Sequence, residues 1–216
     1  TKVTVTGAAV TAVTGSNGSL VSDYALTSDR ADIAARITAK PVSVIVEGGK
    51  DKVYDGTTTM PGLSLAVNGT VAGDTVSAAG HGRFDDRRAG TAVGYAVDDL
   101  ALGGADAGNY QLGSTTLSGG DGSIARRALA VTWTAGDKVY DGNTAATVTA
   151  SDDRIAGDNL IVNQSAAFGD KNVGVGKPVT VSGAALGGSD ADNYQLTNTT
   201  GQASASISRL DTVTWT

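Results

Sequence analysis

Stretches of alternating apolar and polar residues recur along this chain, and such alternation is typical of β-strands with one buried face. The pattern is clearest in residues 203–208, and residues 42–46 and 63–67 are interpreted in the same way. Gly, Asn and Asp separate the stretches, and Asn68-Gly69 is a strong hairpin signal. Further strands are expected at 75–84, 92–102, 110–112 and from residue 123 onward. The pattern therefore predicts an all-β chain.

Residues 28–39 are ambiguous when they are taken alone. Ser28 is a candidate helix cap, and Ile33 and Ile37 have the spacing of one helix face. Their counterpart later in the chain, 203–208, alternates with a period of two residues. We therefore predict a strand for this segment.

Two phrases of the sequence occur twice. The phrase Lys-Val-Tyr-Asp-Gly stands at 52–56 and again at 138–142, which is 86 residues later. The phrase Asn-Tyr-Gln-Leu stands at 109–112 and again at 193–196, which is 84 residues later. A nearly fixed period of this size indicates a tandem array of one folded unit.

The repeat predicts the division of the chain into modules. Residues 1–40 match the second half of the later copies, since 3–10 resemble 179–186, and we assign them to a preceding module. The chain starts in mid-pattern, as expected of a piece of a longer protein. The predicted units are 1–40, complete modules at 41–127 and 128–210, and the first strand of a following module at 211–216. Whether 1–40 fold alone, pair with another chain or indicate a shifted boundary stays open.

The joins between modules contain few flexible residues. Residues 124–133 include no Gly, Pro or Ser, whereas flexible linkers are rich in Gly and Ser. One module's last strand should therefore run almost directly into the first strand of the next. We predict tandem β-sandwich modules, immunoglobulin-like or β-grasp-like, joined end to end into a stiff rod.

Composition limits the kinds of partner. The net charge of −6 over 216 residues argues against binding to nucleic acid phosphates and to anionic membrane surfaces. No apolar run is long enough to span a bilayer, so we expect no membrane insertion. The chain has no cysteine and therefore no disulfide or thiolate site.

The tyrosines of the repeated phrase are interpreted as structural. In Tyr54-Asp55-Gly56 and Tyr140-Asp141-Gly142, Asp can bond the backbone two residues on and Gly can adopt a positive φ. We expect each ring to pack at the edge of the core, with its hydroxyl bonded to a backbone group. This explanation is simpler than a binding loop.

Other candidates for chemistry are weak. The loops Asp106–Asn109 and Asp190–Asn193 could hold Ca²⁺, but they offer few of the six to eight oxygen ligands that this ion takes, so calcium stays open. His81 has no counterpart in the second copy, and Asp85–Arg88 is interpreted as a polar turn. We predict no catalytic, cofactor-binding or metal-binding residue and no enzyme.

The order of these phrases resembles a known repeat family. Lys52–Thr57, Ala72–Asp74, Asn109–Leu112 and Ile124-Ala125-Arg126 together are similar to the YDG/MBG-type repeats of very large bacterial surface proteins. Many of those are filamentous-haemagglutinin-like adhesins of two-partner secretion systems. At Ile37–Lys40 the basic residue is shifted by one position. The resemblance implies an extracellular stalk or adhesive array, and it transfers no ligand-binding residue.

The expected function is a stalk that projects a distal adhesive region from a bacterial cell for attachment or biofilm formation. Its partners would be neighbouring modules, with host or matrix glycan or protein bound through the parent protein. The alternative is that the repeats themselves bind glycan or extracellular matrix. Trp133 and Trp215 recur at equivalent positions and are the candidate stacking residues, although packing explains them better.

Overall fold

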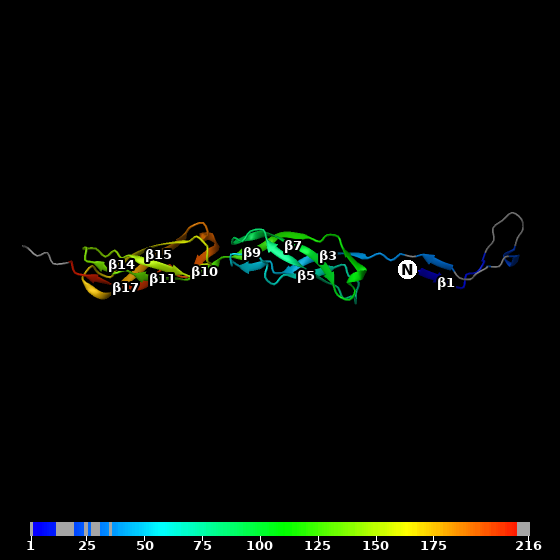
Figure 1. Ribbon diagram of the computed structural model, residues 1–216, viewed down its shortest axis with the longest axis horizontal. Helices are drawn as coiled ribbons and strands as arrows, with labels where there is room; N and C mark the ends of the chain where they lie inside the picture. The colour runs from blue at the N-terminus through cyan, green and yellow to red at the C-terminus, as the bar shows by residue number, and fades with distance from the viewer. Residues whose placement is uncertain (1, 12–19, 24–25, 27–30, 35, 211–216) are drawn as a thin grey trace, which may run out of the picture.

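The computed structural model describes residues 2–11, 20–23, 26, 31–34 and 36–210. These residues form an elongated molecule in which two β-rich modules lie end to end (Figure 1). In the described part of the chain there are strands and short 3-10 helices but no α-helix, and no helix is long and apolar enough to cross a membrane. The predicted all-β, sandwich-like fold is confirmed.

The first module consists of a three-stranded sheet and a four-stranded sheet. Its elements are β3 (Lys40–Gly48), β4 (Asp51–Val53), β5 (Ser64–Asn68), β6 (Ser77–Phe84), β7 (Gly90–Gly103), η2 (Ala107–Asn109), β8 (Tyr110–Leu112) and β9 (Leu117–Ala125). The strand orders are β5-β3-β8 and β4-β9-β7-β6. All strands expected from the sequence in this module are present, and most bounds differ by at most two residues. The last strand begins at Leu117 and not at residue 123, and β4 was not expected.

The second module repeats this arrangement, except that the counterpart of β3 is divided in two. Its elements are β10 (Arg127–Leu129), β11 (Val131–Ala135), β12 (Lys138–Val139), β13 (Val148–Asp152), β14 (Ile161–Phe168), β15 (Gly174–Gly187), η3 (Ala191–Asn193), β16 (Tyr194–Leu196) and β17 (Gly201–Ser208). The four-stranded order β12-β17-β15-β14 matches that of the first module. The pairs β10-β16 and β11-β13 replace the three-stranded sheet.

Each module combines antiparallel and parallel strand pairs. The first strand of each module runs parallel to a strand near its end, with Lys40 opposite Tyr110 and Arg127 opposite Tyr194. The strand before each Tyr-Asp-Gly turn runs parallel to the module's last strand. These registers align the two modules, so that Lys40 corresponds to Arg127.

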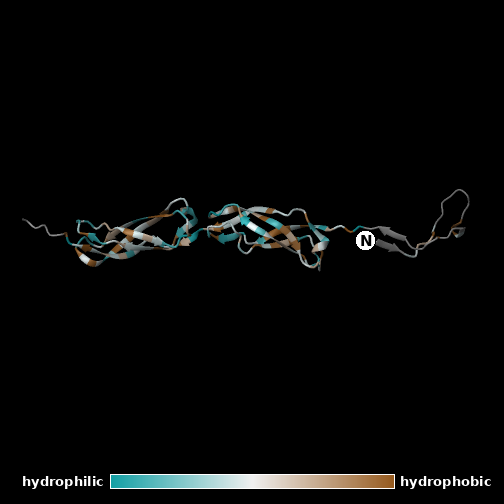
Figure 2. Ribbon diagram, viewed as in Figure 1, coloured by the Kyte–Doolittle hydropathy of each residue, from teal (hydrophilic) through white to brown (hydrophobic). Residues whose placement is uncertain are grey.

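The core of each module lies between its four-stranded sheet and the remaining strands. In the first module Phe84, Val97 and Ile124 are almost fully buried, and in the second Phe168 and Ile207 are. Burial alternates along β6 and β14, as the hydropathy pattern predicts. In Figure 2 apolar segments recur along the strands, and polar segments gather where the modules meet.

Several glycines lie in strands beneath aromatic rings. Gly119 in β9 faces Tyr95, and a Cβ atom there would lie 2.3 Å from the ring. Gly201 in β17 similarly faces Trp133, at 2.4 Å. Where the second module has Trp133 over Gly201, the first has the aliphatic residues Val46 and Leu117 at the matching positions, and both belong to its core cluster.

A two-stranded hairpin precedes the first module. It pairs β1 (Lys2–Val5) with β2 (Ala31–Ala34), and a short helix, η1 (Val21–Asp23), lies between them in the sequence. Val3 pairs with Ile33, in the register that Val179 and Ala203 have in β15 and β17. The strand predicted for 28–39 is present only over β2: residues 36–39 are not a strand, because no neighbouring strand pairs with them, and 27–30 and 35 lie outside the described residues.

The join between the two modules is very short. Strand β9 ends at Ala125 and β10 begins at Arg127, so only Arg126 lies outside both strands. The prediction that the strands follow each other almost directly is confirmed. The predicted module boundaries stay predictions, and 211–216 lie outside the described residues.

Candidate functional site

The repeated phrase forms a corner held together by its lysine. Lys52 Nζ donates hydrogen bonds to Asp55 Oδ1 at 2.7 Å and to the carbonyls of Thr57 and Thr59 at 2.7 and 3.1 Å. The same ammonium lies 5.6 Å from the centre of the Phe84 ring. The Lys52 side chain is only 3% exposed, so its charge is compensated inside the corner.

The aspartate and glycine form the turn that the sequence predicts. Thr57 donates its backbone N–H to Asp55 Oδ1 at 2.9 Å, and Gly56 has a φ of 77°. In the second module, Lys138 bonds Asp141 at 2.8 Å and Gly142 has a φ of 81°. Each corner is therefore built from local contacts that the phrase itself encodes.

Tyr54 has a different role from the one predicted. Its side chain is fully buried, and its ring packs edge-on against Tyr194 of the second module, with centroids 5.4 Å apart. Its hydroxyl donates to Asp158 of the second module, at 2.9 Å from Oδ2. The predicted backbone acceptor is therefore wrong: the acceptor is a carboxylate 104 residues away, because the ring points out of its own module into the next.

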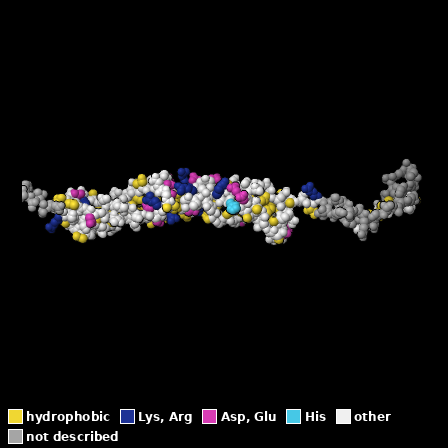
Figure 3. All heavy atoms as spheres, in the orientation of Figure 1, with side chains coloured by type: hydrophobic (Ala, Val, Ile, Leu, Met, Phe, Trp, Pro, Cys, Tyr) yellow, Lys and Arg dark blue, Asp and Glu magenta, His cyan; other side chains and the backbone are white. Residues whose placement is uncertain are grey.

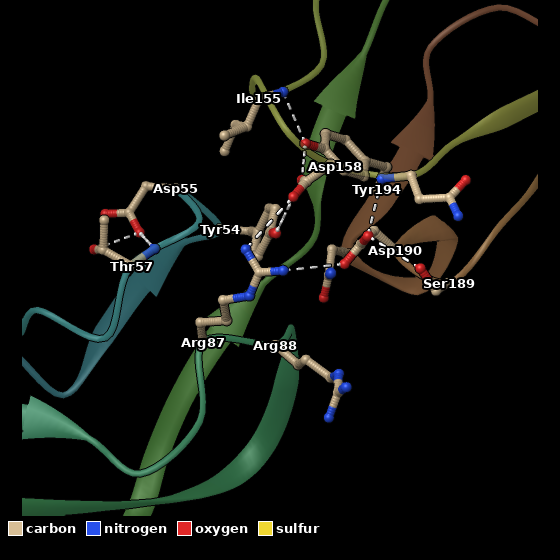
Figure 4. Close-up of polar contacts among 12 residues, drawn as sticks. Tyr54, Asp55, Thr57, Arg87, Arg88, Ile155, Asp158, Ser189, Asp190 and Tyr194 are labelled. Atoms are coloured by element: carbon tan, nitrogen blue, oxygen red, sulfur yellow. Dashed lines mark hydrogen bonds and ion pairs between the residues drawn. The ribbon is translucent and has the colours of Figure 1, made fainter.

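Asp158 is the centre of this joint between the modules (Figure 4). Its carboxylate also accepts a hydrogen bond from Tyr194 at 2.6 Å, and Arg87 Nη1 lies 3.5 Å away. The Tyr194 hydroxyl in turn accepts from the Ile155 backbone N–H at 2.9 Å. A buried carboxylate is tolerated here because two hydroxyls and a guanidinium compensate it.

The turn after β6 completes the joint. Arg87 Nη2 donates to Asp190 Oδ1 at 3.4 Å, and the Ala89 backbone N–H donates to Asn193 Oδ1 at 2.9 Å. Asn193 is 2% exposed, so this contact is buried. The interpretation of 85–88 as only a polar turn is therefore incomplete, because Arg87 reaches the next module.

The apolar core continues through the joint. One cluster of buried side chains includes Val97 and Tyr54 of the first module with Leu129, Leu160 and Tyr194 of the second. Figure 3 shows charged side chains of both signs gathered over the middle of the molecule, where the modules meet. On the face shown, charged residues therefore lie over the buried interior of the joint.

The joint raises the pKa of the two tyrosines that form it. Burial, and then the hydrogen bond to Asp158, raises the pKa of Tyr54 from 10.0 to about 12. The same two causes, in the same order, raise the pKa of Tyr194. The folded joint therefore favours the protonated hydroxyls, which donate to the carboxylate.

We expect the joint to weaken at alkaline pH. Since the pKa of Tyr54 is raised on folding, its contribution is complete below pH 10.0 and is lost as the pH rises toward about 12. Carbon NMR of the ring Cζ atoms should show Tyr54 titrating late, and Tyr54→Phe assigns the signal. Titration of Tyr54 at its ordinary pKa, with the joint still closed, would contradict this expectation.

The two Asp-rich loops are held by their own carboxylates. Asp106 Oδ2 accepts from the Thr75 backbone N–H at 2.8 Å, and Asp190 Oδ2 accepts from the Asn159 backbone N–H at 2.9 Å. The hydrogen bond from Asn159 is the largest cause that lowers the pKa of Asp190. Within the described ranges, no group of three or more His, Cys, Asp or Glu residues could hold a metal ion.

The remaining candidates lie apart from the joint. His81 is exposed, with Nδ1 3.6 Å from Asp99. Trp133 packs its ring on Gly201 inside the second module, and Trp215 lies outside the described residues. The sequence analysis predicts no contact between the residues of the joint. Asp74 and Tyr110 recur as Asp158 and Tyr194 with the same spacing. This recurrence is the signal that could have paired the aspartate with the tyrosine of its own module.

Comparison with known proteins identifies one family. A family model described as "YDG domain" matches residues 38–117 and 125–201. Neither a curated protein nor a solved structure matches the chain. The two matched segments lie on opposite sides of the joint.

Proposed function

The chain belongs to the YDG domain family, and from this premise we propose that its modules are stiff spacers in the stalk of a bacterial cell-surface adhesin. The observation that carries the proposal is the closed joint, in which Tyr54 of one module is buried against Asp158 and Tyr194 of the next. A spacer needs modules whose relative orientation is fixed, and these contacts, which cross from one module to the next, support such a role.

Three kinds of contact oppose bending. The chain passes between modules with only Arg126 outside a strand, the Tyr54 ring fills the interior, and Arg87 and Ala89 bond the loop 190–193. Bending would expose the Asp158 carboxylate's partners to water and separate buried apolar surface. Each lost hydrogen bond costs roughly 0.5–1.5 kcal/mol, and more where one group is charged.

The remaining parts of the proposal concern setting and partners. We propose that the parent protein is secreted and stands on the bacterial surface for attachment or biofilm formation, and that these modules are not catalytic. Their partners are neighbouring modules, while host or matrix glycan or protein is bound elsewhere in the parent protein. The net charge of −6 supports a role that does not involve nucleic acid.

The alternative is that the repeats themselves bind glycan or matrix. Its main candidate, Trp133, packs on Gly201 and belongs to the partly buried residues around the core. A side chain in that position contributes to folding and has little ring surface left for a sugar. Saturable binding of the chain to a glycan array would favour this alternative.

Small-angle X-ray scattering of the chain tests the spacer proposal. We expect a distance distribution typical of a rod, which persists when salt is raised, because the contacts at Tyr54 are buried and little screened. A collapsed particle, or an ensemble that hinges between residues 125 and 127, would contradict the proposal.

A further inference from the structure

The N-terminal face of the first module has the same structure as the face that receives Tyr54. Tyr110 donates its hydroxyl to Asp74 at 2.5 Å, as Tyr194 does to Asp158 at 2.6 Å. The Val71 backbone N–H donates to the Tyr110 hydroxyl at 2.8 Å, and the counterpart of this bond starts from Ile155 and measures 2.9 Å.

The loop beside Asp74 and Tyr110 already has the conformation of its counterpart in the joint. Thr75 donates its N–H to Asp106 at 2.8 Å, and Asp106 returns its own N–H to the Thr75 carbonyl at 3.2 Å. The same two bonds join Asn159 and Asp190 in the occupied joint, at 2.9 and 3.2 Å. The receiving geometry therefore exists before any partner arrives, which lowers the cost of binding.

An open hollow lies where the joint has a tyrosine. Its volume is about 340 Å³, and Thr38, Asp74, Asn109 and Tyr110 are among its lining residues. In the joint, the Tyr54 backbone N–H donates to the Ala125 carbonyl at 2.9 Å, two residues before Arg127. Thr38 lies two residues before Lys40, which corresponds to Arg127, so Thr38 is the counterpart of Ala125. The hollow is therefore bounded by the counterparts of the residues that surround Tyr54.

The groups in the hollow lack the partners that their counterparts have. Asn109 is exposed, whereas Asn193 is buried beneath Ala89. Asp74 accepts from Tyr110, but among the described residues it has no second hydroxyl and no cation like those at Asp158. The unfilled positions are those of a phenol ring and a nearby positive charge.

We propose that this hollow binds the tyrosine of a Tyr-Asp-Gly turn from a further YDG module, whose cation pairs with Asp74 and Asp106. The far end of the second module shows such an occupant: Tyr140 stands in the same corner as Tyr54, and Lys171 replaces Arg87 in the aligned turn. The inference rests on the proposed function, because it extends the same joint beyond the two modules.

Tyramine, which carries a phenol and an ammonium group, is a suitable probe for the intact chain. In amide NMR spectra we expect saturable shifts at Val71 and Tyr110 and none at Ile155 and Tyr194, where Tyr54 already occupies the site. Asp74→Asn should weaken this binding about tenfold, because a charged acceptor is lost. Shifts at both sites, or at neither, would overturn the proposal.

A lengthened chain tests the natural occupant. Replacing residues 1–37 with residues 41–124 places a complete module, with its own Tyr54, before Thr38. We expect the added tyrosine to titrate as late as the original one and the rod to lengthen without a hinge. If the added module folds but hinges freely at the new junction, the proposal is wrong.

The two hypotheses can fail separately. A chain that hinges in scattering while tyramine still binds at Val71 contradicts the spacer function alone. A stiff rod that does not bind tyramine contradicts the open site alone.

Discussion

Tyr54→Ala is expected to lower the free energy of unfolding by about 3–5 kcal/mol, the range for removing a buried aromatic ring, and to let the two modules hinge. The ring is fully buried between modules, and its hydroxyl is one of the donors to Asp158. Its loss leaves a cavity against Tyr194 and a buried carboxylate with fewer partners. The cost should appear as lost coupling between modules.

Chemical denaturation and small-angle scattering measure the two parts of this effect. Tyr140→Ala is the matched control, since Tyr140 occupies the same corner and packs only against the core of its own module among the described residues. The control should lose less stability and keep the rod shape. Equal losses, with an unchanged scattering profile for Tyr54→Ala, would show that the ring does not couple the modules.

Lys52→Met is expected to lower the free energy of unfolding by about 2–3 kcal/mol, the cost of losing hydrogen bonds to a charged group. Methionine preserves the apolar stem beneath Phe84 but leaves Asp55 and the Thr57 and Thr59 carbonyls without their common donor. The corner that positions Tyr54 should loosen as a result. The joint should then weaken together with the first module.

Lys50→Met provides a control two residues away. Lys50 pairs with Asp121 at 2.6 Å on the surface, and such exposed pairs contribute roughly 0–1 kcal/mol. Thermal unfolding of both variants should therefore separate a buried corner lysine from an exposed one. If both substitutions have the same small effect, the corner does not depend on its lysine.

Features that depend on local sequence could be predicted. The strands at 42–46, 63–67 and 92–102 follow from alternation and turn residues, and each Asp-Gly turn follows from contacts within three residues. The short join could be predicted because the absence of Gly, Pro and Ser is visible in the sequence.

Features that depend on contacts between distant residues could not be predicted. Ala72–Asp74 contributes to the sequence analysis only as one of the phrases of the repeat family, although Asp158, the counterpart of Asp74, is the acceptor for two tyrosines. The joint is formed by loops more than 100 residues apart, and a single sequence carries no signal that pairs them. Arg87 and the residue aligned with it, Lys171, share only their charge, so the repeat did not reveal the role of Arg87.

Glycine was also misleading in the strands. The frequency of this residue suggested turns, and many glycines do have a positive φ. Gly119 and Gly201 instead lie in extended strands because a ring occupies the space of their missing side chain. Only the packed structure distinguishes the glycines that need a positive φ from those that make room for an aromatic ring.

The joint has one further consequence, which concerns symmetry. Tyr54 and Arg87 lie at one end of a module, whereas Asp158, Asp190 and Tyr194 lie at the opposite end of the next, so the contact is heterologous. A heterologous contact between units arranged in a line does not close on itself and sets no limit on their number. The length of such a chain is therefore set by the number of repeats that its gene encodes. Gain or loss of one repeat changes the length by one module and leaves every remaining joint intact.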